Sequence, residues 1–319
     1  MTEVLVLRAL GLGDFLTGLP SLRALRSEFR DHRLVLAGPA PLEPLARLAG
    51  CTDAYVACRA LAPLPPLARE PDVAVNLHGR GPQSHRVLLG ARPRRLLSFF
   101  HPEVTASQGG PVWRADEHEV LRWARMLEAF GITVDPTRLE LPVPQRDLPE
   151  GVVGATLIHP GAASEARRWP VARWAEVARR EALRRPVFVT GGPTEVAIAR
   201  QVARLAGLDE GVVLAGRTDL LELTALVAAA GRVASGDTGV AHLATAVGTP
   251  SVVLFGPTSP ARWGPPQGRP QHHVIWKGRT GDPHARTPDP GLLEIEVEEV
   301  VMALQELDRF LFATSGAVQ

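Results

Sequence analysis

The sequence predicts an α/β protein that is built from parallel sheets and divided into two domains. The first observation is residues 232–260, where an apolar strand, a turn, a helix of small apolar residues and a β-branched strand follow one another. A βαβ unit of this length implies parallel strands. The second observation is the length of 319 residues, which suits two domains of about 150 residues each.

Two polar loops leave the strands of this unit at one edge, where open α/β sheets bind their ligands. The loop at residues 236–239 offers backbone N–H groups and the Thr238 hydroxyl at the start of a helix, which suits a phosphate. Asp237 is an anion beside that position, so it either caps the helix or orders the loop and binds a sugar hydroxyl. His242, one turn further on, is either a packed residue or a ligand contact.

Composition excludes several other classes of protein. With 35 basic and 34 acidic residues the formal charge is +1, so bulk electrostatic binding of nucleic acid is not expected. Cys51 and Cys58 are the only cysteines. A bridge between them stays open, although we expect two thiols and no zinc site. Neither a secretory signal nor an apolar run of membrane-spanning length is visible, which favours a cytoplasmic protein.

The chain opens with a strand at residues 4–7, a glycine loop and a helix at residues 15–29. The loop contains Gly11, Gly13 and Asp14. These glycines fall short of a complete G-x-G-x-x-G, which disfavours a dinucleotide site. From spacing alone, Asp14 is equally well explained as a helix cap.

An arginine-rich stretch follows the next strands, which are expected at residues 34–37 and 71–77. His78 and Arg80 come directly after the second of them. Between residues 73 and 102 there is no Asp or Glu but there are five arginines: Arg80, Arg86, Arg92, Arg94 and Arg95. This stretch is either a solvated surface or a cradle for an anionic acceptor, because guanidinium groups bind phosphate and carboxylate through paired hydrogen bonds.

A helix at residues 116–130 and a linker at residues 140–151 lead into the second half, which again alternates strands, loops and helices. A strand at residues 152–158 precedes His159-Pro160-Gly161-Ala162-Ala163, and Arg167-Arg168-Trp169-Pro170 begins the next helix. Strands at residues 186–190 and 212–216 are followed by Glu195 and Thr218, respectively. Residues 262–289 are expected to form an irregular loop, and residues 298–311 a final helix.

These motifs resemble the signature of glycosyltransferase family 9, the heptosyltransferase family. The resemblance is carried by D-T-G-x-x-H-L-A-x-A from Asp237, P-S-V-V-L-F-G-P-T-x-P from Pro250, H-P-G-A from His159 and G-D at Gly13. It implies a GT-B fold, with two Rossmann-like domains whose parallel sheets face each other across a cleft. We expect an acceptor domain at residues 1–146 and a donor domain at residues 147–319, with the last helix, residues 298–314, able to pack back on the first domain.

The resemblance also implies an inverting transfer of a sugar, heptose above all, from a nucleotide donor such as ADP-heptose. Asp14 matches the catalytic base of the family, and Gly13, His78 and Arg80 are expected to bind an anionic glycan or another hydroxyl acceptor. Arg167 stands where the family has a lysine. The positive charge is kept, but a planar, forked guanidinium replaces the compact ammonium group of lysine. The expected donor-binding residues are His159, Gly161, Ala162, Ala163, Arg167, Glu195, Thr218, Asp237, Thr238, Gly239 and His242.

We expect no cofactor besides the donor and no metal, because an arginine and a helix dipole can supply the positive field. The expected state is a monomer that binds no nucleic acid, and a peripheral position at the membrane surface stays open. Two other functions are considered. Asp14 argues against a non-catalytic nucleotide-sugar-binding paralogue, and the lack of a further carboxylate motif argues against a GT-B-like sugar-nucleotide epimerase.

Overall fold

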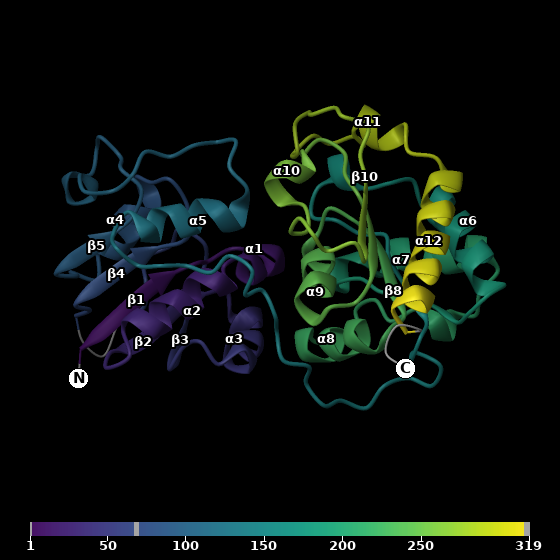
Figure 1. Ribbon diagram of the computed structural model, residues 1–319, viewed down its shortest axis with the longest axis horizontal. Coiled ribbons are helices and arrows are strands. Elements are labelled where there is room, and N and C mark those ends of the chain that lie inside the picture. Colours follow the sequence, from purple (N-terminus) through teal and green to yellow (C-terminus); the bar gives the residue numbers. More distant parts are fainter. Residues whose placement is uncertain (1, 67–69, 316–319) are drawn as a thin grey trace. The chain divides into compact units, whose positions relative to one another are not determined.

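The computed structural model describes residues 2–66 and 70–315 and divides into two compact units, Met1–Pro142 and Val143–Gln319. Each unit is a parallel sheet covered by helices (Figure 1). The predicted α/β class is therefore confirmed. Among the described residues, no helix combines the length and the apolar composition that are needed to cross a bilayer.

The first unit alternates strands and helices along the chain. Its elements are β1 (Glu3–Leu7), α1 (Leu12–Thr17), α2 (Leu19–Glu28), β2 (Arg33–Gly38), α3 (Glu43–Ala49), β3 (Ala54–Ala57), β4 (Val73–Asn76), α4 (Gln83–Leu89), β5 (Arg95–Leu97) and α5 (Glu119–Glu128).

The second unit repeats this alternation. Its elements are β6 (Thr156–His159), α6 (Val171–Ala182), β7 (Val187–Val189), α7 (Val196–Ala206), α8 (Leu220–Ala229), β8 (Arg232–Gly236), α9 (Gly239–Val247), β9 (Ser251–Leu254), α10 (Pro260–Trp263), β10 (His272–Ile275), α11 (Pro290–Leu293) and α12 (Val297–Ser315).

The two sheets each have five strands but differ in strand order. Their strand orders are β3-β2-β1-β4-β5 and β10-β9-β8-β6-β7, and every pair is parallel. In each sheet the first strand in sequence lies inside, with later strands added on both sides of it. The strand order therefore reverses between β1 and β4 and again between β6 and β8. Such switch points leave room for ligands at the carboxyl ends of the strands.

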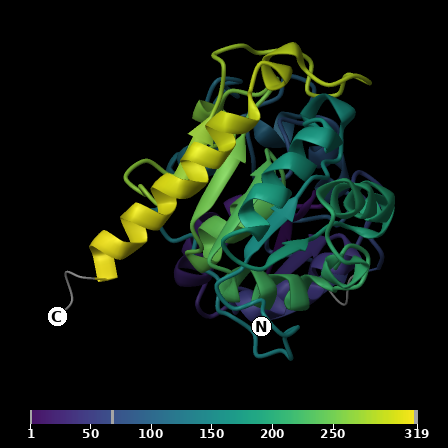
Figure 2. The ribbon, with the colours of Figure 1, turned by 90° about the vertical axis from the view of Figure 1, so that its right-hand side faces the viewer.

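The apolar strands are buried because helices cover both faces of each sheet. Leu5, Val35 and Ala74 lie in register on neighbouring strands of the first sheet and are almost completely buried. In the second unit, α12 packs against α6 and the sheet edge formed by β9 and β10, and its Val300 and Leu304 join the core of that unit (Figure 2). These cores hold the loops at the carboxyl edges in place.

Several sequence-based expectations about individual elements are wrong. The helix expected over residues 15–29 is two helices, since α1 ends at Thr17 and α2 begins with Leu19 and Pro20. Proline in the first turn begins a helix but lacks the N–H that would continue the previous one. The elements β3, α4 and β5 were not expected, because each is short and its apolar pattern is weak.

Two errors concern the second unit. Residues 212–216 contain a single bridge from Val213 to Val189 in place of a strand. The stretch expected to be an irregular loop, residues 262–289, contributes the edge strand β10, which pairs with β9. Its sequence, His272-His273-Val274-Ile275, begins with two polar residues, and as an edge strand it is only partly buried.

Candidate functional site

The carboxyl ends of β6 and β7 bring His159, Thr190 and Glu195 together. Nδ1 of His159 lies 3.0 Å from the Thr190 hydroxyl, and Nε2 lies 3.7 Å from Oε2 of Glu195. The same carboxylate oxygen accepts a 2.7 Å hydrogen bond from the Gly192 N–H. Burial lowers the pKa of His159 and the charge of Glu195 opposes that shift, so the imidazole is neutral at pH 7.

Gly161 lies against this carboxylate. A Cβ atom on Gly161 would lie 2.1 Å from Oε1 of Glu195, so a larger residue would push the carboxylate aside. The next residue, Ala162, is buried, and its carbonyl accepts a 2.9 Å hydrogen bond from Nε of Arg168. Ala163 is exposed. The structure thus joins two loops that the sequence predicted separately.

The carboxyl end of β8, the neighbour of β6, carries a second pair. Nη1 of Arg167 donates to the backbone carbonyl of Asp237 at 3.2 Å and lies 3.9 Å from its carboxylate oxygen Oδ2. Nε of Arg167 is buried without a partner in the described part of the chain. A guanidinium has five N–H donors, so most of the hydrogen-bonding capacity of Arg167 remains unused.

Burial raises the pKa of Asp237 to about 6, against the lowering effect of the Arg167 charge. The interpretation of Asp237 as a helix cap is wrong, because Thr238 is the N-cap of α9. The Thr238 hydroxyl makes no capping hydrogen bond to the described residues. The first N–H groups of α9, beginning at Gly239, thus lack a side-chain cap, which leaves them available to an anion.

The remaining predicted donor residues lie further from these two clusters along the chain. His242 packs edge-to-face on Trp263, with ring centroids 5.8 Å apart. Thr218 is half-buried and follows the Val213 bridge beyond β7. It precedes Asp219, which caps α8. His242 lies on α9, the helix that follows β8. Thr218 lies in the segment beyond β7, at the opposite edge of the second sheet from β10.

In the first unit, Asp14 lies on the first turn of α1, close to the carboxyl end of β1. Its Oδ2 accepts a 3.2 Å hydrogen bond from the N–H of Gly11, which is the actual N-cap. Burial raises the pKa of the Asp14 carboxyl, the charge of Arg8 lowers it, and the charge of Glu119 raises it. An aspartate with a raised pKa at a sheet edge is suited to accept a proton.

His78 follows β4, which is the neighbour of β1. Its Nδ1 accepts a 3.1 Å hydrogen bond from the N–H of Ala9. In the neutral ring the proton is therefore on Nε2. Burial and the charge of Arg8 lower the pKa of His78 to about 4, so at neutral pH the ring is an uncharged N–H donor. Gly13 belongs to the same edge, and its carbonyl accepts a 3.0 Å hydrogen bond from the Thr17 hydroxyl.

The arginine-rich stretch is less positive than its sequence indicates. Arg86 pairs with Glu103 at 2.7 Å, Arg92 with Glu70 at 2.8 Å and Arg94 with Asp72 at 3.6 Å. All three carboxylates come from just outside the acid-free segment. Arg95 lies over the ring of Phe130, 5.8 Å from its centroid. Arg80 and Arg95 are exposed, and neither has an ion pair with any residue that the structure describes. Of these two uncompensated charges, Arg80 is the one that lies two residues from His78.

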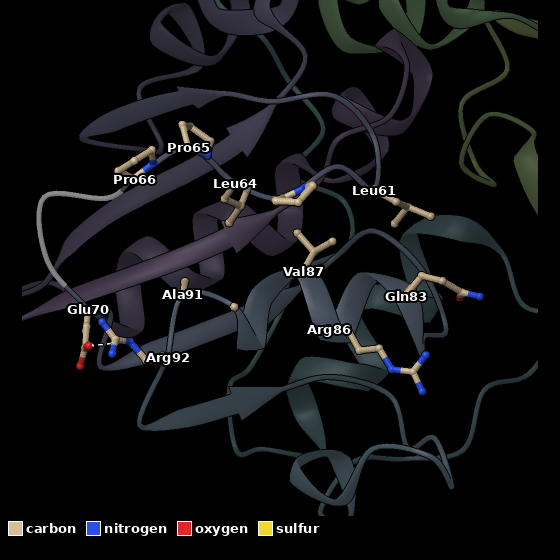
Figure 3. A pocket seen from close by; sticks show the side chains of 12 residues that line it. Leu61, Leu64, Pro65, Pro66, Glu70, Gln83, Arg86, Val87, Ala91 and Arg92 are labelled. Carbon is tan, nitrogen blue, oxygen red and sulfur yellow. Dashed lines mark ion pairs between the residues drawn. The ribbon is translucent and has the colours of Figure 1, made fainter.

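A cavity of about 720 Å³ in the first unit lies between the proline-rich loop and α4 (Figure 3). Leu64 and Val87 face each other across it, and the Glu70–Arg92 ion pair lies at one end. Of the residues considered for the site, only Arg86 and Arg92 of the arginine-rich stretch line this cavity; Asp14, Gly13, His78 and Arg80 do not. In residues 2–66 and 70–315, no three His, Cys, Asp or Glu side chains gather closely enough to hold a metal ion.

Sequence reasoning missed three residues that the structure places at these sites. Thr190, the partner of His159, ends a predicted strand, so its position at the carboxyl edge was available as a signal. Arg8 is a charged residue that directly follows the apolar run of β1, which was also a signal. The sequence around Glu119 gives no such signal, because only the tertiary structure brings its carboxylate to 3.3 Å from the Arg8 guanidinium.

Two parallel α/β units of Rossmann type, each with polar side chains at the carboxyl edge of its sheet, define the GT-B class of fold. A family model described as glycosyltransferase family 9 (heptosyltransferase) matches residues 114–289, more than half of the chain. The chain belongs to glycosyltransferase family 9 and is a glycosyltransferase, which confirms the resemblance seen in its motifs. No curated protein sequence matches the chain significantly.

Solved structures of the same fold cover nearly the whole chain. A family 9 glycosyltransferase from Veillonella parvula has a TM-score of 0.76 at 18% identity, covering 96% of this chain and 97% of its own. The ADP-heptose lps heptosyltransferase II of E. coli has a TM-score of 0.71 at 20% identity, covering 96% and 98%. The E. coli heptosyltransferase WaaC with ADP has a TM-score of 0.68 at 18% identity, covering 96% and 100%.

Proposed function

We propose that this enzyme transfers heptose from ADP-heptose to a hydroxyl group of an anionic glycan, with inversion at the anomeric carbon. The observation that carries the proposal is the Arg167 guanidinium, which has unused N–H donors beside the uncapped start of α9. Positive charge and free N–H groups together suit a diphosphate. The similar structure of WaaC contains ADP, which supports the choice of nucleotide.

The proposed reaction is a single displacement. The acceptor oxygen attacks the anomeric carbon while its proton passes to the Asp14 carboxylate. The bond from the anomeric carbon to the β-phosphate oxygen breaks, and ADP leaves with the electron pair. Arg167 and the N–H groups at Thr238 and Gly239 stabilise the negative charge that develops on the diphosphate. Attack opposite to the leaving group inverts the configuration, and the reaction uses no metal or further cofactor.

The other predicted residues receive roles that fit their surroundings. Glu195, held by Gly192, would accept hydrogen bonds from the ribose, and Gly161 to Ala163 would line the donor beside neutral His159. Thr218 is assigned to the base, and Asp237 and His242 to the sugar and the loop. In the first unit, Gly13, the Nε2–H of His78 and the charge of Arg80 would bind the acceptor.

The variant Asp14→Asn tests the proposal. The wild-type enzyme should release ADP from ADP-heptose, and the variant should do so about 10²–10⁴-fold more slowly while binding ADP equally well, because only the base is removed. Asp31→Asn, an exposed aspartate of the same unit, should behave as wild type. Full activity of Asp14→Asn contradicts the role of Asp14 as base.

A nucleotide comparison tests the donor class independently. ADP should raise the unfolding temperature more than NAD does, because the site offers a diphosphate cradle without a complete dinucleotide fingerprint. Equal protection by NAD would contradict the choice of a nucleoside diphosphate. The proposal retains the expectation of a cytoplasmic monomer, to be checked by fractionation and by light scattering.

A further inference from the structure

Arg8 follows the last residue of β1, and its side chain is completely buried. Its guanidinium serves four acceptors in different parts of the first unit. Nε donates to the backbone carbonyl of Asp14 and Nη1 to that of Leu77, while Nη2 lies 3.1 Å from the Thr17 hydroxyl and 3.3 Å from Oε1 of Glu119. One side chain therefore joins the turn that carries Asp14 to the turn that carries His78.

Glu119, the first residue of α5, is the counter-charge of Arg8. Its Oε1 also accepts a 2.6 Å hydrogen bond from Nε1 of Trp123, and its Oε2 accepts one from Arg122. The Arg8 guanidinium lies over the Trp123 ring, 5.2 Å from its centroid. A buried ion pair of this kind contributes little net stability, because desolvation offsets the Coulomb attraction, but its geometry is strongly specified.

Gly18, between α1 and α2, leaves the space that Arg8 occupies. A Cβ atom on Gly18 would lie 2.7 Å from Nε and 2.8 Å from Cδ of Arg8. A larger residue at position 18 would therefore displace the Arg8 side chain. The backbone of Gly18 has ordinary right-handed helical angles, so the requirement for glycine here is the volume of the arginine.

We propose that Arg8, with Glu119 as its counter-charge, is the positioning residue that sets the place and the charge environment of Asp14. This rests on the proposed function, in which Asp14 is the base. Arg8 reaches Asp14 through the backbone carbonyl, so it holds the turn and leaves the carboxylate for the proton. The same guanidinium holds Leu77, so His78 keeps a fixed place relative to Asp14.

The charges around Asp14 give this arrangement a measurable signature. Arg8 lowers and Glu119 raises the pKa of the Asp14 carboxyl. Arg122 is paired with Glu119, and His78 is neutral above about pH 4. Removal of the Glu119 charge should therefore lower the pKa of Asp14, whereas a change that keeps the Arg8 charge should leave it almost unmoved.

The first experiment is a carboxyl NMR titration of the full chain, with the Asp14 signal assigned by its loss in Asp14→Asn. In Glu119→Gln the midpoint for Asp14 should move to lower pH than in the wild type. This readout needs no substrate, so it stands even if ADP-heptose is not the donor or Asp14 is not the base. An Asp14 midpoint that does not move in Glu119→Gln overturns the proposal.

The second experiment measures ADP release from ADP-heptose in Arg8→Lys. Lysine keeps the charge but cannot serve four acceptors, so turnover should fall about 10–100-fold, the effect of misplacing a catalytic group by about 1 Å. ADP affinity should be unchanged, as should the acidic limb of the pH–rate profile. If Arg8→Lys does not fold, Gly18→Ala displaces the same guanidinium and should lose turnover similarly.

Arg232→Lys is the matched control, since Arg232 is equally buried and pairs with carboxylates at the amino end of β8. It should lower the unfolding temperature without changing turnover per folded molecule. Wild-type turnover in Arg8→Lys, or an equal loss in Arg232→Lys, overturns the positioning role. Wild-type turnover in Asp14→Asn would instead contradict the proposed function, which separates the two failures.

Discussion

Arg167 reaches the backbone carbonyl of Asp237 at 3.2 Å but stays 3.9 Å from its carboxylate. The arginine therefore holds the main chain of the loop and only partly compensates the buried acid. Burial consequently dominates, and the pKa of Asp237 rises to about 6. The phosphate-binding loop therefore contains an acid whose neutral form is favoured by burial, which weakens its repulsion of a bound phosphate below about pH 6.

Asp237→Asn should stabilise the second unit at pH 7.5 but not at pH 4. The folded pKa of about 6 exceeds the ordinary value of 3.8, so the folded state binds the proton more tightly and wild-type stability falls as pH rises from about 4 to 6. The asparagine variant lacks this loss and should gain about 1–3 kcal/mol above pH 6. Urea unfolding without nucleotide measures it, with exposed Asp147→Asn as control. Parallel pH curves for wild type and variant would contradict the shifted pKa.

Arg167→Ala should weaken ADP binding about 10–100-fold, the usual scale for a lost charge-assisted contact of about 1–3 kcal/mol. Arg167→Lys should recover part of this loss, because the ammonium group keeps the positive charge but cannot form the paired hydrogen bonds of the guanidinium. Titration calorimetry measures both. Arg200→Ala is the control, since Arg200 pairs on the surface with Glu210. An unchanged ADP affinity in Arg167→Ala would show that this guanidinium serves only the loop.

Gly161→Ala should reduce ADP affinity about tenfold with little loss of stability, because the new Cβ displaces only the flexible end of Glu195. In a Glu195→Ala background the same substitution should cost almost nothing, since the carboxylate that it displaces is absent. The four ADP affinities form a double-mutant cycle. Additive losses would mean that Gly161 acts by another route.

Arg80→Ala should raise the KM for an anionic glycan acceptor and leave the KM for ADP-heptose unchanged. The reason is that Arg80 carries an uncompensated charge two residues from His78, the predicted acceptor-binding histidine. Steady-state kinetics with both substrates varied measure the split. Arg86→Ala, whose charge Glu103 already compensates, is the control. A similar change in both variants would assign the effect to net charge rather than to Arg80.

The local motifs were predictable because each depends on neighbours in the chain. The strand before Asp237 and the helix after it follow from apolar patterning, and the structure places them at β8 and α9. The family resemblance assigned His159 and Glu195 to the donor site, but it did not predict their proximity, because His159 ends β6 and Glu195 lies in the loop after β7. Their distance depends on the pairing of β6 with β7.

The wrong predictions also have a physical cause in contacts between residues that are distant in the sequence. The acid-free arginine stretch suggested a positive surface, but Glu70, Asp72 and Glu103 fold back to Arg92, Arg94 and Arg86. The helix over residues 15–29 divides at Gly18, where the Arg8 side chain occupies the space that a larger residue would need. Neither effect could be read from spacing, since each depends on partners outside the segment.

By itself, the sequence determined the parallel α/β class, the family and the loops that carry polar residues, because backbone propensity and apolar periodicity act over a few residues. Only the tertiary structure decided which loops meet, how deeply Asp14 and Asp237 are buried and which acceptors Arg8 serves. Leu77 lies 69 residues from Arg8, and Glu119 lies 111 residues from it. Contacts over such separations, and the desolvation that shifts a carboxyl pKa, arise when the sheet brings distant segments to one edge.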